Sequence, residues 1–228
     1  MMQKVLTVGS AICVAAMGTP AAAELVLDQV IVDLEAESPP RDDIEAFNAS
    51  DERIYVLVEP FEIVNAGLAD ETRVPLGPPS ESGMFVSPQR LILEPGERRL
   101  IRIASTGARP EADRVFRVRV RPIVGEVVSQ EDALKVLIGY DALVLLRASE
   151  PQGTFDVVRT GRLLAFANNS NSATEVFAGR QCDEAGETCH DLPGNRLYPG
   201  ERWSVELPFS TKVSFQKAIG SDVTALEF

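Results

Sequence analysis

One segment of the chain, Gln130 to Leu146, alternates between two kinds of side chain and restricts the fold more than any other. Every second residue from Leu134 to Val144 is apolar, whereas the interleaved positions also carry Lys135 and Asp141. A period of two indicates a β-strand with two different faces. A long strand with apolar residues on a weakly buried face exposes an edge that can recruit another chain. Either a second sheet covers that face, or the strand is lent to a partner.

Short strands separated by turn residues are predicted along the rest of the chain, and no long helical pattern occurs. A polar hinge at 148–153 divides these strands into two sets. The first set covers 25–34, 53–61, 84–93, 98–105 and 114–123, and the second covers 155–159, 162–168, 175–182, 203–207, 213–215 and 223–228. Strands at this spacing are typical of antiparallel β-sandwiches. We therefore expect an all-β protein with a first domain of residues 24–148 and a smaller second domain of residues 149–228.

The N-terminus has the layout of a secretory signal peptide. Lys4 gives it a positive start, Val5 to Met17 is mostly apolar, and Ala21 to Ala23 supply a cleavage site. A membrane anchor is the alternative, but the apolar run is too short to span a bilayer. We expect cleavage after Ala23, so that residues 24–228 form an exported, soluble protein.

Two cysteines, Cys182 and Cys189, enclose a short polar turn. In an exported protein a disulfide is the expected state of such a pair. A metal or redox pair is the alternative, but the CxxC spacing is absent and His190 is the single histidine of the sequence. Because two cysteines and one histidine make a poor zinc site, we favour a structural disulfide that clasps a hairpin.

The sequence lacks the motifs of common enzyme active sites. It contains no GxSxG, HExxH or P-loop pattern, and we therefore expect neither catalysis nor a cofactor or metal. The formal net charge of −12 argues against nucleic acid and anionic membranes as main partners. Arg117, Arg119 and Arg121 form a row on one face of a predicted strand, which is either a binding stripe or a solvated face.

Several longer motifs occur in both halves of the chain. The first half contains FNASDERIYVLVEPF (47–61), MFVSPQRLILEPGERRLIRI (84–103) and RVFRVRVRPI (114–123), and the second contains RLLAFANNSN (162–171) and RLYPGERWSVELP (196–208). Together they resemble the periplasmic chaperones of chaperone–usher pilus assembly, and the second half is similar to the alternative or archaic branch. The resemblance implies two immunoglobulin-like β-sandwich domains joined at an angle, with a cleft near the hinge.

The resemblance also implies a function for the alternating segment. Chaperones of this family donate their last first-domain strand to a pilus subunit, which lacks a strand of its own sandwich. In this chain the donor would be about residues 132–146, with Leu134, Val136, Ile138 and Tyr140 entering the groove of the subunit. The expected partners are pilus subunits and an outer-membrane usher, in the periplasm. Self-association of the free chaperone is left open.

One departure from the family concerns the basic pair that anchors the terminal carboxylate of the subunit. Ile31 and Leu143 align with that pair, so the positive charge has to come from elsewhere. Arg102, Arg119 and Arg121 lie on strands predicted nearby, and we expect the carboxylate anchor among them.

A second set of family residues braces the two domains. Arg147 matches an arginine that forms an ion pair across the domain interface, and Asp222 is the partner that the alignment suggests. Val120 falls where the family has an acidic residue on the strand before the donor.

A secreted structural or adhesive component of a pilus is the alternative function. Such subunits usually carry a free N-terminal donor segment, whereas here the first predicted strand begins directly at Leu25. A hydrolase on a sandwich scaffold is a third reading, and the single histidine argues against it.

Overall fold

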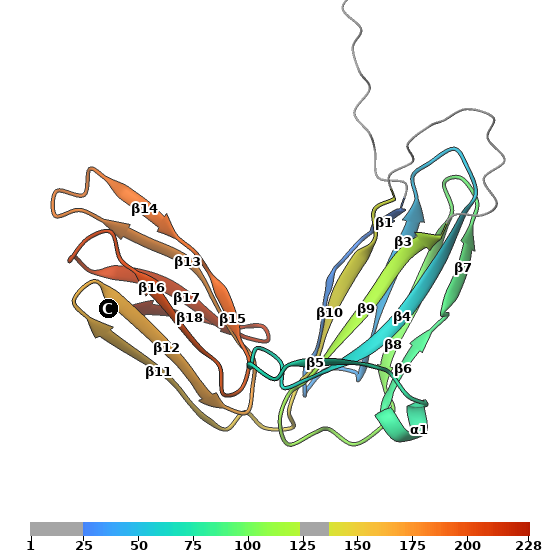
Figure 1. Cartoon of the computed structure of the whole chain (residues 1–228), viewed down its shortest axis with the longest axis horizontal. Helices are drawn as coiled ribbons and strands as arrows, with labels where there is room; N and C mark the ends of the chain where they lie inside the picture. Colours follow the sequence, from blue (N-terminus) through green and yellow to red (C-terminus); the bar gives the residue numbers. More distant parts are fainter. Residues whose placement is uncertain (1–24, 124–136) are drawn as a thin grey trace, which may run out of the picture.

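The computed structural model describes residues 25–123 and 137–228, which form two β-sandwiches set at an angle (Figure 1). The first sandwich contains β1 to β10 and the second contains β11 to β18. The predicted all-β class is confirmed. The helix α1 (Pro79–Ser82) is a single turn, and no helix within the described ranges is long and apolar enough to cross a membrane.

The first sandwich packs a four-stranded sheet, in the order β1-β3-β8-β6, against a second sheet in the order β2-β10-β9-β4-β5, with β7 also pairing with β4. All pairings are antiparallel except that of β10 with β2. The strands are β1 (Leu25–Leu27), β2 (Ile31–Leu34), β3 (Arg41–Asn48), β4 (Ile54–Val64), β5 (Thr72–Pro75), β6 (Met84–Ser87), β7 (Arg90–Leu93), β8 (Arg98–Ser105), β9 (Arg114–Ile123) and β10 (Tyr140–Leu146).

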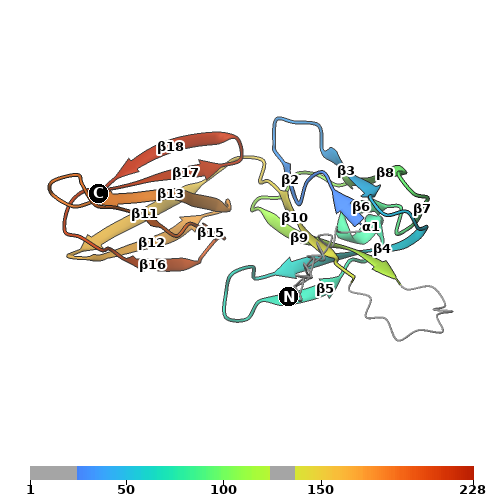
Figure 2. The same cartoon turned by 90° about the horizontal axis from the view of Figure 1, so that it is seen from above.

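The second sandwich packs the sheet β11-β12-β16 against the sheet β14-β13-β17-β18, with β15 also pairing with β13. Figure 2 shows both layers from above. The strands are β11 (Gly153–Thr160), β12 (Leu163–Ser170), β13 (Thr174–Cys182), β14 (Cys189–Leu192), β15 (Asn195–Leu197), β16 (Arg202–Glu206), β17 (Val213–Ile219) and β18 (Asp222–Glu227).

Alternating strands build the two cores. In β9, Phe116, Val118 and Val120 are buried in the first core, while the arginines between them point outward. The second core surrounds Phe166, whose ring centroid lies 5.0 Å from that of Trp203. Burying one such large side chain contributes about 1.5–3 kcal/mol, so these rows of residues supply most of the stabilisation.

Two predicted strands prove to be pairs of strands that change sheet. The segment 25–34 divides into β1 and β2, which belong to opposite sheets of the first sandwich. The segment 84–93 divides at Pro88 into β6 and β7, again in opposite sheets. Proline cannot donate to a strand ladder, which accounts for the second break. The stretch 65–82, where the sequence predicts no strand, contains β5 and α1.

Candidate functional site

Strand β10 is paired unequally on its two edges. On one edge it pairs with β9 along its whole length, from Tyr140 opposite Val120 to Leu146 opposite Arg114. On the other edge β2 pairs only with the part from Leu143 to Leu146. From Tyr140 to Ala142 this edge has no strand partner among the residues that the structure describes. A free edge presents backbone donors and acceptors to which another strand can pair.

Two of the four predicted donor residues lie in the part of the chain that the structure describes, and two do not. Leu134 and Val136 lie outside the described residues. Ile138 is 53% exposed just before β10, so its side chain is available at the surface. Tyr140 packs against the first core, and its hydroxyl donates to the carbonyl oxygen of Leu25 at 3.0 Å. The structure thus places Ile138 at the open end of the strand and ties Tyr140 to its own sandwich.

The C-terminal half of β10 is buried on both faces. Ala142 and Val144 belong to the first core, whereas Leu143 and Leu145 join a small apolar cluster between the sandwiches. That cluster contains Ala66, Val115, Leu143, Leu145 and Ala173, with Ile63 and Tyr198 packed against it. The mixed face of the alternating segment is therefore covered, in this half, by residues of both sandwiches.

Ile31 and Leu143, which align with the basic anchor pair of the family, lie directly opposite each other in the parallel pairing of β2 and β10. Ile31 is 45% exposed and Leu143 is 4% exposed. This position is therefore apolar, and Leu143 contributes to packing between the sandwiches instead of carrying a charge.

The outward face of β9 carries the predicted arginine row. Arg121 donates from Nε to Glu59 Oε2 at 2.9 Å, and this hydrogen bond lowers the pKa of the Glu59 carboxyl. The Arg119 guanidinium lies 5.3 Å from the ring centroid of Phe61. Arg119, Arg121, Tyr140 and Asp141 line a shallow hollow of about 480 Å³ beside the open end of β10. Two of the three predicted anchor residues are thus brought together there.

Arg102 does not belong to this group. It lies in β8, in the opposite sheet of the first sandwich, where it faces Asp43 of β3. Nε and Nη2 of Arg102 donate to the two carboxylate oxygens of Asp43, each at 2.9 Å. The expectation that Arg102 lies near the other two is wrong, because the pairing of β8 with β3 turns it to the far side.

Three residues outside the predicted carboxylate-anchor set complete the charged face. Arg73 of β5 forms a bidentate ion pair with Asp141 of β10, at 3.0 and 2.5 Å, and Nη1 of Arg117 donates to the Asp141 carbonyl oxygen at 3.2 Å. Burial alone would raise the pKa of Asp141, but the hydrogen bonds from Arg73 and the nearby arginine charges hold it below its ordinary value. An acidic residue inside an otherwise apolar strand was the one sequence signal for this pair.

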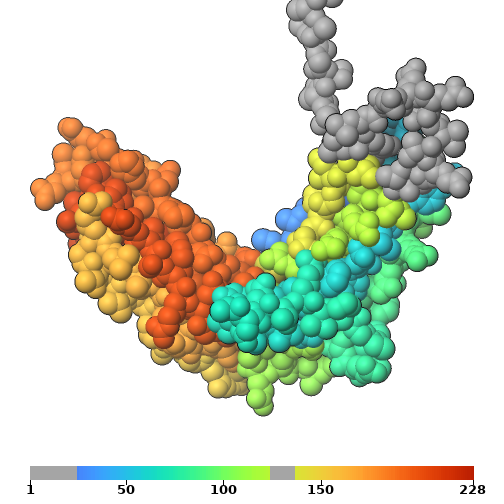
Figure 3. Space-filling view, in the orientation of Figure 1, coloured from blue at the N-terminus to red at the C-terminus, as the bar shows by residue number. Residues whose placement is uncertain are grey.

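The unpaired charges of this face are those of Arg117 and Arg119. Among the described residues neither forms an ion pair, whereas Arg73 and Arg121 are each neutralised by a carboxylate. Ile63, Glu71, Arg117 and Tyr198 help to line a second cavity, of about 210 Å³, between the two sandwiches. The molecule is concave between the two sandwiches (Figure 3). Among the described residues, Arg117 and Arg119 are therefore the two arginines of this face without a carboxylate partner.

Arg147 follows β10 directly and is 8% exposed at the junction of the sandwiches. It donates to both carboxylate oxygens of Asp33, at 2.8 and 2.6 Å, to Asp113 at 2.8 Å and to the carbonyl oxygen of Ala173 at 2.6 Å. The Asp113 carboxylate also accepts from the backbone N–H groups of Ala148 and Ala173. Burial alone would lower the pKa of Arg147, but the two carboxylates raise it above its ordinary value.

This network corrects the predicted partner of Arg147. Asp222, the predicted partner of Arg147, forms no ion pair with it and lies across a cavity of about 310 Å³ that both residues line. Val120 is buried in the first core, and the acidic residue on this side of the network is Asp113, which precedes β9 by one position. Both partners lie far from Arg147 in the sequence, so the pairing could not be found from local patterns.

The remaining predicted residues lie in the second sandwich. Cys182 and Cys189 form a disulfide, as predicted, and face each other across the β13–β14 hairpin. The ring of His190 lies 5.4 Å from that of Phe209. Over the described ranges, no group of three or more His, Cys, Asp or Glu residues is arranged to hold a metal ion.

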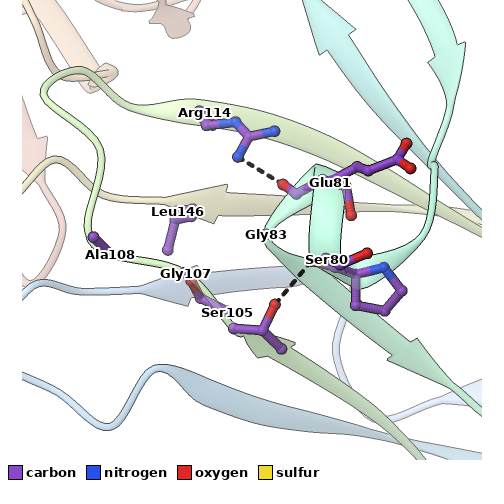
Figure 4. Close-up of a pocket in the computed structure, with 11 residues that line it drawn as sticks. Ser80, Glu81, Gly83, Ser105, Gly107, Ala108, Arg114 and Leu146 are labelled. Atoms are coloured by element: carbon purple, nitrogen blue, oxygen red, sulfur yellow. Dashed lines mark hydrogen bonds between the residues drawn. The ribbon is translucent and has the colours of Figure 1, made fainter.

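A further cavity, of about 440 Å³, lies beside α1 (Figure 4). Its one cationic side chain, Arg114, donates to the carbonyl oxygen of Ser82 at 2.8 Å and pairs with Glu62 at 2.8 Å. Thr106 donates to the carbonyl oxygen of Pro79 at 3.2 Å. The buried hydroxyl of Ser105, which also lines the cavity, has no hydrogen-bond partner among the described residues. Because the arginine of the cavity is already paired, the cavity is a weaker candidate site than the β10 edge.

No protein-family model matches the sequence, and a search of curated proteins gives no significant match. The structure, in contrast, resembles solved structures over almost its whole length. A class 5 fimbriae chaperone, CfaA, is 21% identical, with a TM-score of 0.62 over 89% of this chain and 98% of that chain.

Two complexes give similar values. A chain in the structure of the Salmonella enterica SafA pilin with the SafB chaperone is 16% identical, with a TM-score of 0.63 over 92% of this chain and 98% of that chain. A chain in the CsuC–CsuE chaperone–tip adhesion subunit complex of Acinetobacter baumannii is 13% identical, with a TM-score of 0.59 over 90% and 98%. The chain therefore has the two-domain β-sandwich fold of the fimbrial chaperones.

Proposed function

We propose that this protein is a chaperone of pilus assembly that binds pilus subunits by donating a β-strand, about residues 132–146. The observation that carries the proposal is the unequal pairing of β10. Its N-terminal part has one edge without a partner among the residues that the structure describes, while its C-terminal part is buried in two apolar clusters. A strand held in this way can pair with a partner without leaving its own sheet. The fold supports the proposal, because solved structures with this fold include complexes with a pilin and with a tip subunit.

The physical basis is the exposed core of an incomplete sandwich. A subunit that lacks a strand exposes an apolar groove and unpaired backbone groups, so it aggregates unless another chain fills the groove. Leu134, Val136 and Ile138 supply three apolar side chains at alternate positions, and each contributes about 1.5–3 kcal/mol on burial. Tyr140 acts as a fourth donor residue only if the hydrogen bond from its hydroxyl to the Leu25 carbonyl oxygen breaks when the subunit binds. The backbone ladder sets direction and register.

A carboxylate of the subunit would complement the concave face. We assign its binding to Arg117 and Arg119, because these two guanidinium groups have no carboxylate partner within residues 25–123 and 137–228, whereas Arg121 is paired with Glu59. An arginine at such a site can hold a carboxylate through two parallel hydrogen bonds. The salt dependence of capture should reflect this contact, since the two side chains are partly open to solvent.

The proposal extends to the cellular setting. Residues 1–23 would direct export, residues 24–148 and 149–228 would be the two domains, and the protein would act in the periplasm and deliver its subunit to an outer-membrane usher. Strand donation requires neither catalysis nor a cofactor.

The decisive experiment is co-expression with a pilus subunit in a bacterial periplasm, followed by affinity capture and size-exclusion chromatography. The test variant is Val136→Asp with Ile138→Asp. The control variant is Val158→Asp with Val223→Asp, which places the same charges at positions of the second sandwich that are 61% and 57% exposed. Capture by the wild type and the control, together with loss of capture by a folded test variant, is the expected result. A complex that tolerates the two donor-strand charges would favour a structural component of a pilus instead.

The anchor is tested with Arg117→Gln and Arg119→Gln, and Arg102→Gln is the matched control on the opposite sheet. We expect the first two to weaken capture several-fold and the third to have no effect. A subunit extended by a few residues at its C-terminus distinguishes the terminal carboxylate from an acidic side chain. Equal capture by all three arginine variants would rule out this assignment.

A further inference from the structure

The loop between β4 and β5, residues 65–71, is held in a fixed shape. Two turn bonds close it, from Leu68 N to the Asn65 carbonyl oxygen at 3.0 Å and from Glu71 N to the Leu68 carbonyl oxygen at 3.1 Å. Asn65 Nδ2 donates to Asp70 Oδ2 at 2.8 Å, and Gly67 N donates to Glu71 Oε2 at 2.7 Å. A loop with this many internal hydrogen bonds can act as a rigid projection from the first sandwich.

The loop meets the second sandwich at the turn between β15 and β16, as the neighbouring segments in Figures 1 and 3 show. Ala66 is 9% exposed, and Tyr198 of that turn packs against the cluster that Ala66 joins. Leu68 approaches Gly200, since a Cβ built on Gly200 would lie 3.7 Å from Leu68 Cδ2. The contact therefore combines apolar packing with a close approach of two turns.

Gly67 occupies the tightest point of the contact. Its φ of +75° lies in the left-handed region, which favours glycine. A Cβ built on Gly67 would lie 2.3 Å from Glu201 Oε2, which is closer than packed atoms allow, and 3.1 Å from Tyr198 Cδ2, which is a tight contact. Glu201 is itself held in place, because its Oε2 accepts from Tyr198 N at 2.9 Å. A side chain at position 67 must therefore displace a hydrogen-bonded carboxylate or move the two sandwiches apart.

This contact supplements the junction at Arg147. The bonds from Arg147 and to Asp113 attach the second sandwich at Ala173. Asn171 is also tied to the first sandwich, because its carbonyl oxygen accepts from Asp113 N at 2.8 Å and its Nδ2 donates to the Glu111 carbonyl oxygen at 2.6 Å, and Ser221 Oγ donates to Glu35 Oε2 at 3.4 Å. The contact at Tyr198 adds a further attachment, and it adjoins the apolar cluster that contains Leu143 and Leu145 of β10. These attachments together define how the open edge of β10 faces the second sandwich. Interfaces inside a chain otherwise permit relative motion of domains.

We propose that the 65–71 loop is a latch that sets the angle between the two sandwiches, and that Gly67 is the positioning residue of the subunit-binding edge. The effect on the angle follows from the contacts alone. The effect on capture rests on the function proposed above.

The test compares two glycines that share a left-handed conformation. Gly67→Ala adds a methyl group inside the contact, whereas Gly96→Ala adds one at φ +74° with nothing within 4 Å. Spin labels on Leu100→Cys and Val158→Cys, at exposed positions of the first and second sandwich, report the distance between the sandwiches. We expect Gly67→Ala to shift or broaden the distance distribution and Gly96→Ala to leave it unchanged. Adding Glu201→Ala, which removes the obstructing carboxylate, should restore a distribution close to that of Glu201→Ala alone.

Leu68→Ser provides a second variant in case Gly67→Ala does not fold, since it weakens the apolar contact at an exposed position and should cause a smaller shift in the same direction. In the capture assay Gly67→Ala should retain several-fold less subunit than Gly96→Ala. An unchanged distance distribution in folded Gly67→Ala and Leu68→Ser would refute the proposal that the 65–71 loop sets the angle between the sandwiches. A clear shift with undiminished capture would overturn the positioning role of Gly67. Failure of the wild type to capture a subunit would refute the proposed function, and the distance measurement would still decide the latch.

Discussion

Replacing Asp113 with alanine is the most informative single change at the junction. Its carboxylate is fully buried and accepts three hydrogen bonds, from Arg147 Nη1 at 2.8 Å, Ala148 N at 2.7 Å and Ala173 N at 2.8 Å. Two of these donors belong to the chain around the hinge, and Ala173 belongs to the second sandwich. The substitution removes one member of a buried ion pair and one tie between the sandwiches at the same time.

The expected loss of stability follows from these contacts. Removing one partner of a buried ion pair typically costs about 3–5 kcal/mol, because the other charge remains buried. Arg147 keeps Asp33, which reduces this cost, while two buried backbone N–H groups lose their acceptor at about 1–3 kcal/mol each. We therefore expect Asp113→Ala to lower the free energy of unfolding by about 3–5 kcal/mol. A protein from the middle of the ordinary stability range of about 5–15 kcal/mol remains folded after such a loss.

Urea unfolding can measure both effects, because the chain has a single tryptophan, Trp203, which lies in β16 of the second sandwich. Its fluorescence follows the second sandwich alone, whereas far-ultraviolet circular dichroism follows both. We expect the two transitions to coincide in the wild type and to separate in Asp113→Ala. Separate transitions by different probes are the sign that two units no longer unfold together.

Asp43→Ala is the matched control for this experiment. It also removes an aspartate that forms a bidentate pair with an arginine, Arg102, but on the exposed outer face of β3 and β8. Exposed pairs contribute little, so its unfolding curve should stay close to that of the wild type. A loss of about 1 kcal/mol or less for Asp113→Ala, which is the size expected of a surface pair, would refute the reasoning. So would coincident transitions in a clearly destabilised Asp113→Ala protein.

Two further predictions concern the second sandwich. Burial, with a smaller contribution from the charge of Glu71, raises the pKa of Glu201 above its ordinary value, so the folded state binds its proton more tightly than the unfolded state. The free energy of unfolding should therefore fall as pH rises between the unfolded and folded pKa values of Glu201. Urea unfolding measured across that pH range should show this fall in the wild type, and the part due to Glu201 should be missing in Glu201→Gln. Identical pH profiles of the two proteins would contradict the prediction. Replacing Cys182 and Cys189 with serine opens a short closed loop and should lower the free energy of unfolding by about 2–3 kcal/mol. Trp203 fluorescence in urea measures this loss, and an unchanged unfolding midpoint would contradict the prediction.

Much of the fold could be predicted from the sequence because alternation depends on neighbouring residues. The segment 114–123 alternates in the sequence, and β9 has the same alternation of buried and outward residues. The boundaries at which a strand changes sheet could not be predicted, since β1 and β2 look like one continuous apolar strand. Strand β5 was missed because its four residues are mostly exposed and carry no apolar alternation.

The candidate site was only partly predictable for the same reason. The open end of β10 was found because Ile138 belongs to the alternating pattern. The partners of Arg147 were not found, because Asp33 is 114 positions away and its approach depends on the parallel pairing of β2 with β10. Arg102 and Arg119 look alike in the sequence, and only the pairing of β8 with β3 and of β9 with β10 puts them in different sheets.

The unequal burial along β10 has a consequence for how such a protein can diverge. From Ala142 to Leu146 no side chain is more than 4% exposed, whereas Ile138 is 53% exposed. Substitutions in the buried part disturb packing in two apolar clusters at once, and those at the exposed end cost little stability. Evolution can therefore change the surface that this end offers to other proteins while the rest of the strand, and the architecture that depends on it, stays the same.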